Sequence, residues 1–76
     1  MRIRFDRPVA GRLEIADAED EVILETSLAP GSTETVVRLR AGLYRVTFTE
    51  EGPGSRTANR VAAIAGPTTL QMNVPA

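Results

Sequence analysis

The sequence predicts an all-β fold: a single small seven-stranded antiparallel β-sandwich with Greek-key connections. Apolar residues recur at every second position through most of the chain, which is the spacing of strands with one buried face. Turn-forming residues interrupt this alternation about every ten residues, as is typical of sandwiches and barrels. No linker or internal repeat divides the 76 residues, so we expect one domain, residues 1–76.

Seven alternating segments mark the expected strands. They cover residues 3–5, 12–16, 22–28, 35–40, 43–49, 59–64 and 68–74. Pro and Gly favour turns and interrupt strand ladders, so we expect strands to end at Arg7-Pro8, residues 29–32 and Gly66-Pro67. Residues 50–55, with two Gly and a Pro, are expected to form a loop.

The alanine-rich segment 58–65 is the one expected strand that has a helical alternative. Asn59, Val61 and Ile64 lower its helix propensity, and the segment is too short to be a stable helix alone. A strand is therefore favoured. The apolar residues expected to face the core are Phe5, Leu13, Ile15, Val37, Leu39, Tyr44, Val46, Phe48, Val61, Leu70, Met72 and Val74.

A compact motif lies between the fourth and fifth expected strands. It reads Val37-x-Leu39-x-x-Gly42-x-Tyr44-x-Val46-x-Phe48. Gly42 can adopt a positive φ where a turn requires it, and Tyr44 can bury its ring while its hydroxyl reaches a backbone group. We expect Leu39, Gly42 and Tyr44 to form a structural corner, as in immunoglobulin-like sandwiches. The alternative is a plain hairpin with a half-buried Tyr44.

This motif resembles the L-x-x-G-x-Y corner of transthyretin-like (prealbumin-like) β-sandwiches, which include carboxypeptidase regulatory-like domains and the B-type repeats of bacterial collagen adhesins. Residues 9–23 resemble the opening hairpin of such domains, with Asp20 or Glu21 where a Gly is usual. Residues 61–74 resemble their closing pair of strands. The resemblance implies a β-sandwich of a kind that usually holds, spaces or docks neighbouring parts of larger secreted or surface proteins.

Three arginines, Arg38, Arg40 and Arg45, surround the expected corner. In a two-residue hairpin, Arg38 faces Arg45 across the ladder, and the like charges repel. In a corner, the two strands separate and the arginines need no special partner. We interpret the three as a solvated face balanced by Glu34 and Glu50, with contact to acidic residues of a neighbouring subunit as the functional alternative.

The composition argues against catalysis, cofactors and metal binding. The chain has no His or Cys and its nine basic residues are all Arg, so the commonest general base, thiol nucleophile, Schiff-base lysine and zinc ligands are missing. The acidic run 17–21 lacks the order of a calcium loop, and we interpret it as a solvated hairpin tip. The aromatic residues all lie at core positions, so no stacking surface for nucleic acid is expected. We expect no enzyme activity.

The charge and the N-terminal segment bear on partners and location. A net charge of −1 attracts neither nucleic acid nor an anionic membrane. The start of the chain, MRIRFDRPVAGRL, lacks the apolar stretch of a secretory signal, and no run reaches membrane-spanning length. We therefore expect a protein made in the host cytoplasm, without nucleic acid, membrane or small-molecule substrate as a partner.

A core this small, without disulfides or zinc, is expected to gain stability by assembly. The resulting hypothesis is a structural protein that binds a larger protein shell or lattice, or copies of itself. Its most specific form is a phage virion accessory protein, such as a capsid decoration or cement protein. The alternatives are a carbohydrate- or protein-binding module of a bacterial surface protein, and a small cytoplasmic regulator or inhibitor that presents a sheet edge to an enzyme. The expected contacts are the exposed edge strands together with Arg38, Arg40, Arg45, Met1, Arg2 and Pro75.

Overall fold

The computed structural model describes residues 1–54 and 56–74. In these residues the chain forms five strands and no helix: β1 (Arg2–Ala16), β2 (Val22–Val36), β3 (Gly42–Glu50), β4 (Thr57–Ile64) and β5 (Thr69–Met72). They belong to one sheet with the order β2-β1-β3-β4, and β5 pairs with β1. Every pairing is antiparallel except that of β1 with β5, which is parallel. The all-β prediction is confirmed, whereas the seven separate strands and the wholly antiparallel pairing are wrong.

The strand count differs because turn-forming residues lie inside two long strands. β1 passes through Pro8, and its ladder with β2 changes register between Arg4 and Val9. Because Pro8 lies in this irregularity, its missing N–H does not interrupt the regular pairing. In β2, residues 29–31 lie opposite the single residue Ala10, because Ser32 pairs with Val9 and Leu28 with Gly11. The Pro and Gly of this segment therefore make a bulge within β2 and do not end it.

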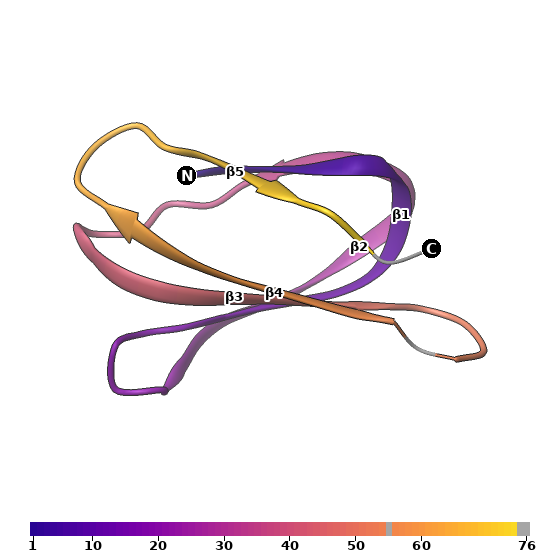
Figure 1. Ribbon diagram of the computed structural model, residues 1–76, viewed down its shortest axis with the longest axis horizontal. Helices are drawn as coiled ribbons and strands as arrows, with labels where there is room; N and C mark the ends of the chain where they lie inside the picture. The colour runs from indigo at the N-terminus through magenta and orange to yellow at the C-terminus, as the bar shows by residue number, and fades with distance from the viewer. Residues whose placement is uncertain (55, 75–76) are drawn as a thin grey trace.

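The two halves of β1 have different neighbours (Figure 1). Residues 2–5 pair with β5, whereas residues 11–16 pair with β3. In Figure 1, β5 and the start of β1 run along the top of the view, and β3 and β4 run below them. The Phe5 ring packs against the Phe48 ring of β3, with centroids 4.9 Å apart. Both halves of β1 thus contribute to one hydrophobic core.

The core contains most of the residues that were expected to form it. The fully buried side chains are Phe48, Ile3, Leu13, Ile15, Met72 and Val46. Two expectations were inaccurate: Leu39 is only partly buried, and Val61 is 60% exposed. The expectation that Val61 lies in the core is wrong because β4, which is a strand as predicted, turns Ala58, Ala62 and Ile64 inward. The opposite phase places Val61 on the outer face.

Gly11 determines how closely β1 and β3 approach each other. It pairs with Leu28 of β2 on one side and with Glu50 of β3 on the other. A Cβ at this position would overlap the backbone oxygen of Thr49 and lie 3.0 Å from Cζ of Phe48. Glycine is therefore required here for space, at the point where β1 leaves its bend.

We expect Gly11→Ala to lower the free energy of unfolding by about 2 to 3 kcal/mol, because the added methyl group has to displace backbone atoms in a packed region. Urea denaturation followed by circular dichroism measures this. Gly66→Ala is the matched control, because a Cβ at Gly66 meets no atom within 4 Å. Equal stability of the two variants would contradict the close approach of β1 and β3.

Candidate protein-binding surface

Tyr44 closes the corner between β2 and β3. Its side chain is buried, and its hydroxyl donates a hydrogen bond to the backbone oxygen of Arg40 at 2.8 Å. Leu39 packs against the core, and Gly42 lies beside the ring, because a Cβ there would be 3.5 Å from Cε2 of Tyr44. β1 separates β2 from β3 in the sheet, so the two strands do not form a hairpin. The structure therefore places Gly42 beside Tyr44, and Leu39 against the same core, in a segment that is not a hairpin.

The three arginines near this corner do not share an ion-pair network. Arg45 lies opposite Ala16 and Val61 in the ladders, and its Nη1 is 2.7 Å from Oδ1 of Asp20. The Arg38 and Arg40 side chains are exposed and form no ion pair with any residue that the structure describes. Among these three arginines, Arg45 is thus the one that forms an ion pair with a residue that the structure describes, Asp20.

The N-terminal residues of the expected interface are held against β2. The Met1 amino group donates to the backbone oxygen of Val37 at 2.6 Å, and the Val37 N–H donates back to the Met1 oxygen at 2.8 Å. Nε of Arg2 lies 3.8 Å from Glu34. Glu34 therefore pairs at this end of the sheet instead of balancing the corner arginines. Pro75 lies outside the described residues.

Glu50, the second expected counter-charge, is also paired elsewhere. Its Oε2 accepts a 2.7 Å hydrogen bond from Nη1 of Arg7, and its Oε1 lies 3.6 Å from Nη1 of Arg56. Its side chain is only 16% exposed. The hydrogen bond from Arg7 lowers the pKa of Glu50, and the same bond raises the pKa of Arg7. The carboxylate is therefore held in its ionised form beside the bend of β1.

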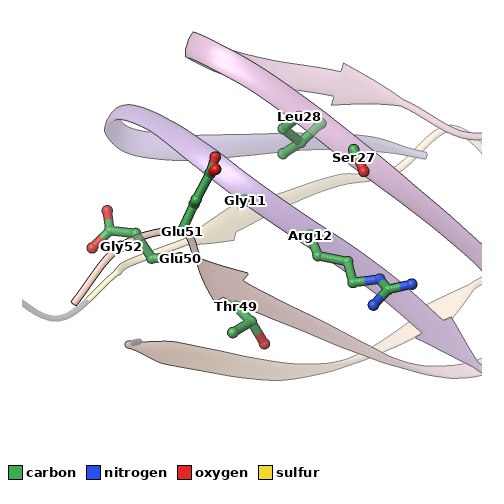
Figure 2. A pocket seen from close by; sticks show the side chains of 8 residues that line it. All are labelled: Gly11, Arg12, Ser27, Leu28, Thr49, Glu50, Glu51 and Gly52. Carbon is green, nitrogen blue, oxygen red and sulfur yellow. The ribbon is translucent and has the colours of Figure 1, made fainter. Parts of the chain in front are cut away.

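An open hollow of about 590 Å³ adjoins Glu50 (Figure 2). It is lined by Gly11, Arg12, Ser27, Leu28, Thr49, Glu50, Glu51 and Gly52. Its charges are largely paired, because Arg12 lies 3.1 Å from Glu25 and Glu50 binds Arg7. Within residues 1–54 and 56–74, no group of acidic side chains could hold a metal ion. The hollow thus offers the Ser27 and Thr49 hydroxyls, the Glu51 carboxylate and backbone groups for hydrogen bonding.

The acidic run 17–21 forms the turn between β1 and β2. Oδ1 of Asp17 accepts hydrogen bonds from the backbone N–H groups of Glu19 and Glu21, at 2.9 and 3.0 Å. Asp20 has a φ of 63°, in the left-handed region that glycine adopts most easily. This is one of the two positions where the resemblance expects a glycine. The carboxylates of Asp17 and Asp20 are used to shape the turn and to bind Arg45.

Exposed apolar side chains gather on the outer face of the sheet, which sequence reasoning missed. Val22 and Leu43 are each 50% exposed, and Val61 is 60% exposed. The ladders align one row across β2, β1, β3 and β4, made of Val22, Ala16, Arg45 and Val61. Leu43 lies opposite Ala63 beside this row and lines a small hollow with Arg45 and Val61. We call this surface the outer patch; it consists of Val22, Leu43, Arg45, Val61 and Ala63, and the buried Ala16 lies between Val22 and Arg45 in the row.

No family model, curated protein or solved structure matches the chain. The likeness to transthyretin-like sandwiches therefore stays a prediction. Among the described residues there is no helix of the length and apolar character needed to cross a membrane.

We expect Tyr44→Phe to destabilise the fold by about 1 kcal/mol, because the Arg40 carbonyl loses its donor while the buried ring is kept. Chemical denaturation gives the value. Ser32→Ala removes a hydroxyl that donates to the Ala29 oxygen at an exposed site, and it should change stability much less. A Tyr44→Phe variant as stable as Ser32→Ala would show that the hydroxyl contributes nothing to the corner.

The ion pair of Glu50 predicts a defined pH dependence. Because its pKa is lowered in the folded state, the pair adds stability above the unfolded-state value of about 4.3, and the gain is lost as pH falls through the folded-state pKa. Glu50→Gln should therefore cost stability at about pH 7, and this cost should shrink toward about pH 2. Urea titrations of both chains at several pH values test this. A cost independent of pH would mean that the carboxylate charge is not responsible.

Proposed function

We propose that this chain is a non-enzymatic structural domain that binds protein through the outer patch. The observation that carries the proposal is the exposure of Leu43 and Val61, which are diagonal neighbours on the outer face of adjacent strands. Burying the exposed half of such a side chain against a partner is favourable by about 1 kcal/mol each. Arg45, held by Asp20, supplies a fixed charge among them that can orient a partner.

We further infer that the sheet acts as a β-sandwich that presents this patch rigidly. The two halves of β1 pair with different strands, β5 and β3, which supports two layers. The contact of Phe5 with Phe48 supports a core between them. In a sandwich of this kind, the outer faces are free for binding while the inner faces are filled.

The larger assembly is the most specific part of the proposal. We propose that the chain is a subunit of a protein shell or lattice, and in particular a phage virion accessory protein such as a capsid decoration protein, which binds through an apolar patch with a charged component. The outer patch has both components. On this proposal the partner is a protein whose contact surface is apolar, with a group that Arg45 can bind.

A photo-crosslinking residue placed at Leu43 tests this function in the cells that produce the protein. We expect the crosslinker to trap one partner protein. The mass of that partner alone should exceed that of two copies of the 8.2 kDa chain. The same residue placed at Val36 is the matched control, because Val36 is 64% exposed but lies at the far end of β2. Trapping of the same proteins from both positions, or of none from Leu43, would contradict the outer patch as the binding surface.

Once the trapped protein is identified, Leu43→Lys should weaken its binding at least about tenfold, which corresponds to about 1.4 kcal/mol. Stability should change by no more than about 0.5 kcal/mol, because the side chain is half exposed in the free domain. Calorimetric titration measures the affinity, and thermal melting measures the stability. Val36→Lys should bind like the unmodified chain.

A further inference from the structure

We infer that β4 pairs with β4 of a second copy of this chain, antiparallel and across a two-fold axis at Val61. This assignment rests on the protein-binding function proposed above, because it names a partner for the β4 side of the outer patch. The sheet would then continue from β4 of one copy into β4 of the other. β4 has a free edge, a sequence compatible with pairing, and one register that pairs seven residues without opposing like charges.

β4 is an edge strand with a free side. Residues 57–64 pair with β3, and in the part of the chain that the structure describes no strand pairs with the other side of β4. β5 comes near β4, but the contact between them is a side-chain hydrogen bond that Nη1 of Arg60 donates to the backbone oxygen of Gln71, at 2.8 Å. An unpaired strand edge exposes N–H and C=O groups that readily pair with another strand.

The other edges carry features that oppose such pairing, and β4 does not. β2 is interrupted by the bulge at residues 29–31, which breaks the regular edge that a second strand would need. β5 has only four residues. β4, with the sequence TANRVAAI, has no Pro, no Gly and no acidic residue. Its one charge is Arg60.

Symmetry restricts the register of two paired β4 strands. Opposed residues have to lie on the same face of a continuous sheet, so the two-fold axis has to pass through a residue and not between two residues. An axis at Arg60 would oppose two guanidinium groups, which is unfavourable. An axis at Ala62 would pair only residues 60–64. An axis at Val61 pairs residues 58–64 and opposes Arg60 to the neutral Ala62.

The axis at Val61 also covers the most exposed part of the outer patch near this edge. Val61, at 60% exposure, would contact Val61 of the second copy. Ala63 would lie opposite Asn59, which is already bound to Thr47 within its own copy. The two Arg60 side chains would be diagonal neighbours and not directly opposed, and each has the Gln71 oxygen of its own chain as acceptor. The register at Val61 therefore covers an exposed apolar side chain and opposes no like charges directly.

Single cysteines test the register directly, because the chain has no cysteine of its own. Residues opposed in an antiparallel pair have Cα atoms about 4.5 to 5.5 Å apart, within the range of a disulfide. Val61→Cys should therefore form a covalent dimer under mild oxidation at least about tenfold faster than Ala63→Cys. Two Ala63 positions would be about 14 Å apart along the strands. Val36→Cys, exposed on the other edge, is a second control.

The mass of the unmodified chain completes the test. Sedimentation equilibrium should give twice the 8.2 kDa of the chain at high concentration, and Val61→Lys should return the monomer while Val36→Lys should not. The Asn59→Cys, Ala63→Cys double variant should crosslink as fast as Val61→Cys. Similar rates for Val61→Cys and Ala63→Cys, or an unmodified chain that stays monomeric, would overturn the β4 pairing. The Leu43 crosslink to a different protein is independent of these results, so failure of the dimer and failure of the proposed function are distinguishable.

Discussion

β1 hydrogen-bonds three other strands, and its bend decides which of them it can reach. Before the bend it lies between β2 and β5, and after the bend it lies between β2 and β3. Gly11 allows β3 to approach at the end of the bend, and the Val74 N–H donates to Asp6 within it, at 3.1 Å. A strand that serves two sets of neighbours lets a small core be enclosed by few strands. This arrangement also leaves β2 and β4 as the two edge strands of the β2-β1-β3-β4 order.

The exposure of Val61 in the outer patch follows from the phase of β4 in the sheet. The inward residues of β4 include Ala58 and Ala62, which are small enough to lie against the filled interior beside Phe48 and Tyr44 of β3. The larger Val61 is left on the outer face. Exposed valines are common on strands, but this one continues a row that Arg45 and Ala16 extend across the sheet. The orientation that buries Ala58 and Ala62 of β4 is therefore the same one that exposes Val61.

Features that depend on residues near each other in sequence could be predicted. The hydroxyl of Tyr44 reaches Arg40 only four positions earlier, and the turn at 17–21 is closed by Asp17 itself. The continuity of β1 through Pro8, and its parallel pairing with β5, depend on distant segments and could not be predicted. Alternation located a strand at β4 but not its inward face, because Ala and Val are both compatible with burial. The outer patch was missed for the same reason.

The Asp20–Arg45 pair connects the turn at 17–21 to the outer patch. Asp20 holds a left-handed conformation that glycine would adopt at lower cost, so an aspartate here is not the best choice for the turn alone. Its carboxylate receives Nη1 of Arg45 at 2.7 Å, but an exposed ion pair adds little to stability. The remaining effect of the ion pair is on the orientation of the Arg45 guanidinium. The aspartate holds a guanidinium among apolar side chains, and on the function proposed above this orientation would serve a bound partner more than the isolated fold.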